Sequence, residues 1–373
     1  MSRLASYELY RLEAPLGRVI GDNSCAYDRL GVIAVCLKTA AGLEGWGFAE
    51  VQAMGRFDRA APWIRPLPDR AALMARFEQD WWLQLKDRVV SETDALRRTG
   101  RSTEPALDSV VGLALWDLKA QEAGLPLYRF LGGSTARTQC RAYGSLLDFP
   151  LADSEAVAVA RQLLSLGIVD LKVKVGAESA QRDIDRLNLI AGVAGVAGVA
   201  GGAVTLSADA NEAWDWMTAL GRLEAFAAAG INLQYIEDPL PRHDIEGFRA
   251  LCERSPVPVI GHDYLTRVED LELLVEAGLK GIRTNGSIDY MLDCLQLAQR
   301  CGLPVYVGNS FAEVLVHFAC AFPQVDRMEY SDLALSDLIT RPVVIVDGEA
   351  IPPEVPGHGL VLRSEFRDVP AQH

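Results

Sequence analysis

Short apolar runs recur through the second two-thirds of the chain, and a stretch with helical spacing follows each of them. Eight such runs begin 23 to 35 residues apart, at 141–147, 169–175, 204–211, 233–239, 257–263, 281–285, 304–309 and 327–331. Nearly continuous apolar strands are typical of a parallel sheet that is buried on both faces. Strands that alternate with helices at this spacing predict a closed parallel barrel, not an open sheet.

The first third of the chain has a different pattern. Residues 30–37 are rich in β-branched side chains, and the turn-like segment 39–45 separates them from a second strand-like run at 46–50. This arrangement predicts a β-hairpin. Apolar positions three to four residues apart then predict a helix over 106–123. The N-terminal part is therefore expected to be an α+β unit, a small sheet followed by helices.

The last forty or so residues return to strand-like patterns. Residues 342–346 and 360–362 are apolar and predict a strand pair, which we expect to return to the N-terminal unit. These patterns divide the chain into three parts: an N-terminal α+β domain at 1–133, a barrel at 134–331 and a C-terminal tail at 332–373.

Two lysines stand at alternate positions of the predicted strand 169–175. Strand side chains alternate between faces, so Lys172 and Lys174 point the same way. Two like charges in an apolar strand lower each other's pKa. A lysine with a lowered pKa can act as a general base near neutral pH. The alternative is an edge strand that carries two solvent-facing lysines.

Three successive predicted strands end in a carboxylate: Asp209, Glu237 and Asp263. Active sites of barrel enzymes lie at these strand ends, and neighbouring strands are about 4.8 Å apart. Converging carboxylates repel one another unless a hard cation lies between them, and an all-oxygen set with room for water suits Mg²⁺. The alternative is that each acid caps the helix that follows it.

Composition narrows the choice of partners. The formal net charge of −14 argues against a nucleic-acid or anionic-membrane surface, although a bound metal can still attract an anionic substrate. The seven cysteines are scattered and lack CxxC spacing, which favours reduced thiols in a cytoplasmic protein. We see no pattern of a signal peptide and no apolar run of membrane-spanning length.

Taken in series, these motifs resemble the enolase superfamily, in its mandelate racemase and muconate lactonizing enzyme branch. The resemblance rests on Ala-Leu-Trp-Asp-Leu-Lys-Ala (114–120), Leu131-Gly132-Gly133, Lys172-Val173-Lys174, Asp209-Ala210-Asn211 and Glu237-Asp238-Pro239. It implies a modified (β/α)₇β barrel with an α+β capping domain built from the N-terminal part and the tail. It also implies Mg²⁺, abstraction of a proton alpha to a small carboxylate substrate, and an even-numbered homo-oligomer.

The same resemblance implies roles for individual residues. Lys174 would be the base, while Lys172 would lower its pKa and contact the substrate carboxylate. Glu329 would be protonated and donate a hydrogen bond to the enediolate. Asp209 and Glu237 would be two of the metal ligands. The family usually has Gly-Glu at the third position; here the pair is His262-Asp263, and the spacing from Pro258 favours Asp263, with His262 left open as the ligand or as an acid.

The chain departs from the family at the second catalytic position. Asn285 and Asn309 stand where relatives carry an Asp and a His, or a Lys on the sixth strand. Racemisation normally needs an acid or base on each face of the substrate, so it is disfavoured. Elimination from one face remains, with Lys174 as the base. Lys172, Tyr264, His262 or Lys174 itself would protonate the departing hydroxyl.

The resemblance and these departures favour a lyase, an acid-sugar dehydratase that converts an aldonate or aldarate to a 2-keto-3-deoxy acid. The alternatives are an epimerase or racemase, a cycloisomerase of the muconate lactonizing type, and a catalytically silent binding homologue. We expect loops at 17–24 and 53–57 to close over the substrate. The expected substrate contacts are Arg18, Asn23, Arg56, Asn211, Arg283, Asn285 and Asn309; Arg283 in particular would hold a distal carboxylate or hydroxyl.

Overall fold

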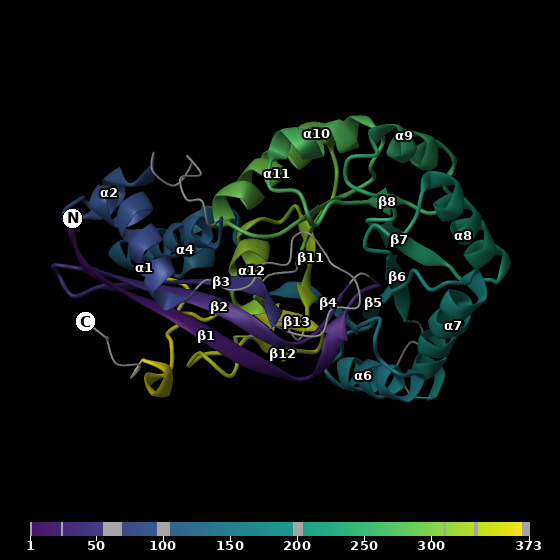
Figure 1. Cartoon of the computed structure of the whole chain (residues 1–373), viewed down its shortest axis with the longest axis horizontal. Coiled ribbons are helices and arrows are strands. Elements are labelled where there is room, and N and C mark those ends of the chain that lie inside the picture. The colour runs from purple at the N-terminus through teal and green to yellow at the C-terminus, as the bar shows by residue number, and fades with distance from the viewer. Residues whose placement is uncertain are drawn as a thin grey trace.

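The structure is a computed structural model that describes residues 2–23, 25–54, 69–94, 105–196, 204–308, 311–331 and 335–367. A barrel surrounded by helices occupies one side of the molecule, and a long antiparallel sheet with helices on it occupies the other (Figure 1). Two predicted substrate contacts, Arg56 and Asn309, lie outside the described residues.

Eight parallel strands form the barrel, in the order β8-β7-β6-β5-β4-β11-β10-β9. They are β4 (Cys140–Leu147), β5 (Asp170–Lys174), β6 (Thr205–Asp209), β7 (Leu233–Glu237), β8 (Val259–Ile260), β9 (Ile282–Thr284), β10 (Val305–Val307) and β11 (Val325–Tyr330). A parallel bridge between Gly261 and Ile282 joins the two ends of this sheet. Each predicted run contains one of these strands, so the predicted parallel barrel is confirmed.

Helices cover the outside of the barrel. They are α6 (Asp153–Ser165), α7 (Ala180–Val196), α8 (Trp216–Ala228), α9 (Ile245–Arg254), α10 (Val268–Glu276), α11 (Ile288–Cys301) and α12 (Ala312–Ala321). Side chains cap three of them: Asp215, Asp244 and Ser287 accept hydrogen bonds from backbone N–H groups in the first turn. Helix α12 is buried along its whole length, as its apolar sequence requires.

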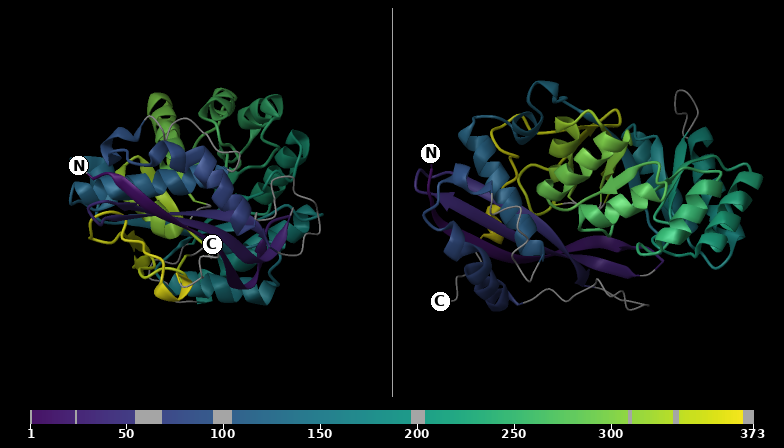
Figure 2. Two further views of the ribbon diagram at one scale, coloured as in Figure 1. Left: turned by 60° about the vertical axis from the view of Figure 1, so that its left-hand side comes forward. Right: turned by 90° about the horizontal axis from the view of Figure 1, so that it is seen from above.

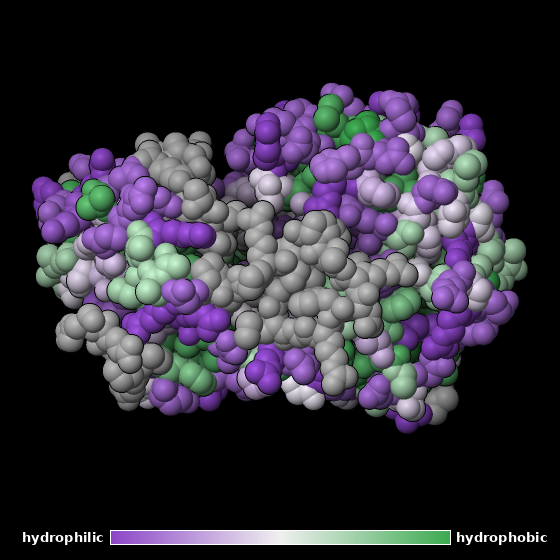
Figure 3. Space-filling view, viewed as in Figure 1, coloured by the Kyte–Doolittle hydropathy of each residue, from purple (hydrophilic) through white to green (hydrophobic). Residues whose placement is uncertain are grey.

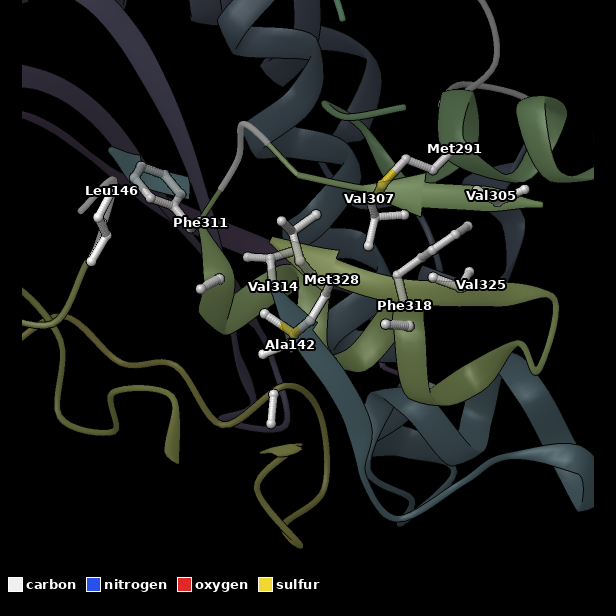
Figure 4. Packing of buried hydrophobic residues seen from close by; sticks show 14 of the residues in the cluster. Ala142, Leu146, Met291, Val305, Val307, Phe311, Val314, Phe318, Val325 and Met328 are labelled. Atoms are coloured by element: carbon white, nitrogen blue, oxygen red, sulfur yellow. The ribbon is translucent and has the colours of Figure 1, made fainter. Parts of the chain in front are cut away.

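The barrel core is built from the apolar side chains of strands and helices. Val305 and Val307 of β10 and Met328 of β11 pack near Met291 of α11 and Phe318 of α12 (Figure 4). All five are fully buried. Burial of a side chain of this size contributes about 1.5–3 kcal/mol relative to exposure, so the cluster fixes the strand ends that carry the polar residues.

The cap sheet has the order β1-β2-β3, with β1 (Leu4–Gly21), β2 (Ala26–Thr39) and β3 (Glu44–Met54). The predicted hairpin is present as β2 and β3. The helical segments beside it are α1 (Arg70–Phe77), a π-helical turn (Glu78–Trp82), α2 (Leu83–Leu85), α4 (Pro105–Glu122) and α5 (Leu127–Gly132), with 3₁₀ turns at Val90–Glu92 and Gly133–Thr135.

The loop predicted at 17–24 is partly wrong, and of the loop predicted at 53–57 only residues 53 and 54 lie within the described ranges. Strand β1 runs to Gly21 because its pairing with β2 resumes after an irregularity, with Ile20 opposite Tyr27. This pairing satisfies backbone groups of Ile20 and Gly21 that a loop would leave to water. Strand β3 likewise extends to Met54. The tip of the β1–β2 hairpin thereby reaches the mouth of the barrel (Figure 2), where Phe149 N donates to Gly21 O at 3.1 Å.

The predicted strand pair in the tail is also wrong. Strand β12 (Val344–Val346) pairs with β13 (Glu349–Ile351), not with 360–362, and β13 continues onto β4. Asp347 and Gly348 have φ angles of 50° and 80°. Two successive residues with positive φ form the tight turn that two-residue hairpins favour, so the chain reverses at once. A 3₁₀ turn at Ser364–Phe366 follows near the end of the described tail.

The tail lies against the cap helices and against the barrel. His358 N donates to Asp117 Oδ1 at 2.8 Å, and His358 Nε2 lies 2.6 Å from Trp46 O. On the barrel side, His317 Nε2 lies 3.0 Å from His358 O.

The domain boundaries themselves stay a prediction. Polar side chains dominate the face drawn in Figure 3, and none of the helices in the described ranges is long and apolar enough to cross a bilayer.

Candidate active site

A small cavity lies between the carboxyl ends of the barrel strands and the tip of the β1–β2 hairpin. Its volume is about 50 Å³. The cap contributes Ile20, Gly21, Asp22, Cys25 and Tyr27, and the barrel contributes Ser145, Asp148, Lys172, Lys174, Asn211, Asp263, Tyr264, Arg283, Glu329 and Ser331. One water takes up about 30 Å³, and pockets for small molecules are typically about 300–1,000 Å³. An acid of five or six carbons therefore requires the hairpin tip or the lining side chains to move.

Strand β5 positions both lysines on the cavity side. It lies inside the sheet between β4 and β6, which excludes the solvent-facing edge strand as an alternative. Lys172 Nζ lies 2.8 Å from Glu237 Oε1, 3.4 Å from Asp209 Oδ2 and 3.3 Å from Glu329 Oε1. Lys174 Nζ lies 2.5 Å from Asp209 Oδ2. The Lys174 side chain is 16% exposed and that of Lys172 only 1%, so Lys174 is the more accessible of the two.

The expected lowering of the lysine pKa values is wrong for this arrangement. Burial lowers the pKa of Lys174 and the repulsion from Lys172 lowers it further, but the surrounding carboxylates, chiefly Asp209 with Asp22 and Glu237, together outweigh both, so the net pKa is raised. Burial also lowers the pKa of Lys172, and Glu237 and Glu329 more than offset it. The sequence argument counted the repulsion between the lysines and not the carboxylates that surround them.

The proposed metal carboxylates are held by cations of the same chain. Asp209 and Glu237 are paired in register on β6 and β7, and Lys172 bridges them. Arg283 Nε lies 3.0 Å from Glu237 Oε1, and Arg283 Nη2 lies 3.7 Å from Asp263 Oδ1. Within the described residues, no three His, Cys, Asp or Glu side chains are placed as a set that could hold a metal ion. Glu237 Oε2 is nevertheless buried and has no hydrogen-bond partner.

None of these three carboxylates caps the helix that follows it. Helix α8 is capped by Asp215 and α9 by Asp244, and α10 has no side-chain cap. The helix-capping alternative is therefore excluded, and the burial of the carboxylates needs another explanation.

Glu329 is ionised here, not protonated as the resemblance implied. Burial raises its pKa, but Arg283 and Lys172 outweigh burial and hold the pKa well below its usual value. Arg283 Nη2 donates to Glu329 Oε2. Gly308 makes room for this pair, because a Cβ at that position would overlap both side chains. The Arg283 guanidinium is thus occupied by carboxylates of the protein, and its predicted contact with a distal substrate group stays a prediction.

Of the two candidates on the fifth strand, only Asp263 lines the cavity. Asn285 Nδ2 donates to Asp263 Oδ1 at 2.6 Å and to Asp263 O at 2.8 Å. His262 is not among the residues that line the cavity. Its ring lies between Glu212 Oε1 at 3.3 Å and Asp238 Oδ2 at 3.4 Å. The suggested catalytic role of His262 stays a prediction.

Other predicted contacts join the cap to the barrel. Asn23 Nδ2 donates to Ala210 O at 3.2 Å, and Arg18 Nη2 donates to Leu146 O at 3.0 Å. Asn211 lines the cavity and donates to Tyr264 Oη at 2.9 Å.

Tyr27 and Asp148 are among the cavity residues that sequence reasoning missed. Asp148 directly follows the first barrel strand, and the same strand-end pattern that identified the other acids could have found it. No sequence signal singles out Tyr27, because its place depends on how the hairpin meets the barrel.

Comparison with known proteins identifies the family. Residues 155–366, more than half of the chain, match the family described as "Enolase C-terminal domain-like". This chain belongs to the enolase superfamily. A solved structure from Mesorhizobium loti that carries a provisional mandelate racemase description is 34% identical, has a TM-score of 0.85, and covers 98% of this chain and 93% of its own. The chain thus lies in the mandelate racemase and muconate lactonizing enzyme branch.

Its curated relatives are enzymes of more than one class. The L-talarate/galactarate dehydratase of Salmonella typhimurium is 31% identical over 69% of this chain and 64% of its own length. The arabinonate dehydratase of Saccharolobus solfataricus is 27% identical over 89% and 88%. The D-Ala-D/L-Ala epimerase of Cytophaga hutchinsonii is 31% identical over 58% and 56%. The chain therefore spans less than two thirds of two of these relatives.

A second solved structure was determined with ligands. The L-talarate dehydratase of Polaromonas sp. JS666, in complex with Mg and L-glucarate, is 25% identical with a TM-score of 0.81. The match covers 98% of this chain and 97% of that one.

Proposed function

We propose that this protein is a Mg²⁺-dependent acid-sugar dehydratase that removes water from a 2,3-dihydroxy acid and gives a 2-keto-3-deoxy acid. The observation that carries the proposal is the arrangement of Lys172 and Lys174 in the wall of the cavity, against Asp209 and Glu237. Asn285, at a position where relatives in the branch carry a second base, donates a hydrogen bond to Asp263, and an amide cannot act as a general acid or base near neutral pH. One-face elimination fits this arrangement better than two-base racemisation.

Asp209, Glu237 and Asp263 are the residues that would hold Mg²⁺, once the ion replaces the contacts that Lys172 and Arg283 now make with them. The buried Oε2 of Glu237, which lacks a hydrogen-bond partner, is the kind of hard oxygen ligand that this ion prefers. Four carboxylates (Asp209, Glu237, Asp263, Glu329) face three cations (Lys172, Lys174, Arg283), so the site carries an excess of negative charge. When bound, Mg²⁺ would supply positive charge that stabilises the negative oxygens of an enediolate.

Lys174 would move the proton. Its Nζ accepts the proton from C2 as the C2–H bond breaks, and the electron pair moves into the substrate carboxylate to form the enediolate. The same electrons then form the C2–C3 double bond while the C3–O bond breaks. The hydroxyl leaves as water with a proton from the protein, and the enol becomes the 2-keto acid. Because Lys174 carries a proton while it is paired with Asp209, substrate binding must first weaken that pair.

Lys174 is also the most suitable group to protonate the departing hydroxyl. His262 is not in the cavity lining and contacts Glu212 and Asp238 instead. Tyr264 lines the cavity, but burial raises the pKa of its hydroxyl well above the usual value, with Asp22 adding to the shift, which makes it a weaker acid. A syn elimination, in which Lys174 returns the proton that it took, uses a group already in place.

A turnover screen with Mg²⁺ against aldonic and aldaric acids of four to six carbons tests the proposal, with 2-keto acid formation as the readout. We expect at least one acid to be dehydrated, and Lys174→Ala to abolish this activity. A panel in which no acid yields a 2-keto acid would contradict the proposal.

The second candidate is an epimerase. The acidic side chains of Asp22 and Asp148 in the cavity could accommodate an ammonium group, such as that of a dipeptide. Solvent deuterium in recovered substrate, without 2-keto acid, would favour this function. A silent binding homologue would show neither dehydration nor exchange of the alpha proton with any ligand.

A further inference from the structure

The carboxylate of Glu329 has a cation at each of its two oxygens. Lys172 Nζ lies 3.3 Å from Glu329 Oε1, and Arg283 Nη2 donates to Glu329 Oε2. Held between two cations, the carboxylate is ionised, and an ionised carboxylate accepts hydrogen bonds but has none to donate. Glu329 therefore does not supply the hydrogen bond to an enediolate that the family resemblance assigned to it.

Arg283 is the cation beside Glu329 that has a donor left over. A guanidinium carries five N–H groups and keeps its charge in proteins. Nε donates to Glu237 Oε1 at 3.0 Å, and Nη2 donates to Glu329 and lies 3.7 Å from Asp263 Oδ1. Within the described residues, Nη1 donates one hydrogen bond, to Thr284 O at 3.4 Å. Since Arg283 lines the cavity, the remaining N–H group of Nη1 is available to a bound ligand.

The backbone leaves room for the pair of Arg283 and Glu329. The pair joins β9 to β11, which are separated in the sheet by β10. Gly308 directly follows β10, and a Cβ at that position would overlap both side chains. Glu329 is not one of the proposed metal ligands. The pair therefore holds the guanidinium in place whichever cation contacts Glu237 and Asp263.

We propose that Arg283 is a catalytic residue that stabilises the enediolate, and that Glu329 is a positioning residue that orients its guanidinium. The inference rests on one part of the proposed function, the removal of the alpha proton. When the C2–H bond breaks, its electron pair adds a second negative charge to the carboxylate oxygens of the substrate. A fixed cation in the cavity wall attracts this dianion more strongly than the singly charged acid, so it lowers the barrier to proton removal.

The first test removes the guanidinium. Arg283→Met keeps an unbranched side chain and loses every donor. Removal of one donor to a developing oxyanion costs about 10²–10³-fold in kcat, so kcat for the best acid of the panel should fall by at least about a hundredfold. KM reflects the singly charged acid and should change by less than about tenfold. Arg283→Lys keeps the charge and should recover part of the loss in kcat. The matched control Arg300→Met removes an exposed arginine of α11 that is paired with Glu272, and it should change neither constant.

Two further variants keep the inference testable if Arg283→Met does not fold. Gly308→Ala removes no charge, and the atoms that must move to admit its methyl group are the ends of the Arg283 and Glu329 side chains. We expect far-UV circular dichroism like that of the wild-type protein and a loss of at least about tenfold in kcat. Glu329→Gln keeps an acceptor for the guanidinium, so its kcat should fall less than that of Arg283→Met, again with little change in KM. A larger loss in Glu329→Gln than in Arg283→Met would return the stabilising role to Glu329 and overturn the inference.

The readout separates this inference from the dehydratase. Each variant is assayed with Mg²⁺ for 2-keto acid and for exchange of the alpha proton with solvent deuterium, because the enediolate precedes both. Exchange without 2-keto acid, reduced at least a hundredfold by Arg283→Met, would support the inference and overturn the dehydratase. Formation of 2-keto acid at an unchanged rate in Arg283→Met would overturn the inference and leave the dehydratase intact. Neither product nor exchange from any acid with the wild-type protein would contradict both.

Discussion

Two buried polar regions of this protein follow opposite rules. Where the tail meets the cap, His317, His358 and Asp117 are bonded to backbone groups, such as Trp46 N at 3.0 Å from Asp117 Oδ2. At the barrel mouth, side-chain cations are bonded to side-chain carboxylates from different strands. Buried ion pairs add little net stability because desolvation offsets their attraction, whereas buried backbone groups are costly to leave without partners. The first region therefore stabilises the fold, and the second is kept for chemistry.

The largest effect we expect is on activity at the barrel mouth. Lys174→Ala removes the proposed base, and general bases contribute about 10²–10⁴-fold to rate, so kcat for the best acid of the panel should fall by at least that factor. Lys280→Ala removes an exposed lysine just before β9, at the opposite end of its strand from the cavity, and serves as the matched control. Equal losses in the two variants would show that the decrease does not depend on the lysine at the cavity.

The next effect concerns stability at the junction of cap and tail. Asp117→Ala leaves the backbone N–H groups of Trp46 and His358 without their acceptor, at a cost of about 1–3 kcal/mol each. Urea denaturation should therefore show a loss of several kcal/mol in the free energy of unfolding. Because Asp117 does not line the cavity near Lys174, kcat of the folded fraction should remain close to wild type. A large decrease in kcat with unchanged stability would reverse the roles that we assign to the two regions.

The two regions also differ in how well they could be predicted from the sequence. The eight barrel strands, the shared face of Lys172 and Lys174 and the adjacency of Asp209 and Glu237 follow from strand periodicity and strand order, which are local properties. The pKa of Lys174 could not be predicted in the same way. It depends on the summed field of groups on other strands, mainly Asp209, and neither their distances nor the partners that they choose are encoded locally.

The tail shows the same limit at the level of the backbone. Apolar runs predicted strands at 342–346 and 360–362, but the positive φ angles at Asp347 and Gly348 gave the first of them a partner only a few residues away, at Glu349–Ile351. The sequence pair His262-Asp263 likewise did not determine which of the two side chains lines the cavity, because either of them could have entered it. In both cases the sequence allowed two arrangements, and only the tertiary structure decided between them.

A smaller effect should appear in how the free energy of unfolding depends on pH, because a buried histidine at the cap–tail junction resists protonation. Burial lowers the pKa of His317 to about 3, so the unfolded chain binds a proton below about pH 6.5 while the folded protein does not. The stability from this group is complete above pH 6.5 and falls as the pH decreases towards 3, by up to about 1.4 kcal/mol per unit. Urea denaturation at pH 7.5 and 5.5 should show the loss, and His317→Asn should reduce it.

His262 should act in the opposite direction. Burial lowers its pKa, but Asp238 and Glu212 raise it to a net value above the usual one. Its contribution is therefore complete below about pH 6.5 and is lost as the pH rises through the raised pKa. His262→Asn should steepen the loss of stability between pH 7.5 and 5.5, while His317→Asn should flatten it. A change of the same sign in both variants would contradict the assignment of opposite pKa shifts.

The smallest effect on stability should come from a carboxylate of the mouth. Asp263→Asn keeps the shape of the side chain and removes one of the four negative charges that face three cations. Because this relieves the excess negative charge, the free energy of unfolding without added metal should stay within about 0.5 kcal/mol of wild type or rise slightly.

If Asp263 is a Mg²⁺ ligand, the additional stability that Mg²⁺ confers through binding to the folded state should be much reduced in the variant. Thermal denaturation over a Mg²⁺ titration measures both quantities. An equal Mg²⁺ response in the variant and the wild-type protein would remove Asp263 from the ligand set, and a large loss of stability without metal would mean that the mouth supports the fold as the cap junction does.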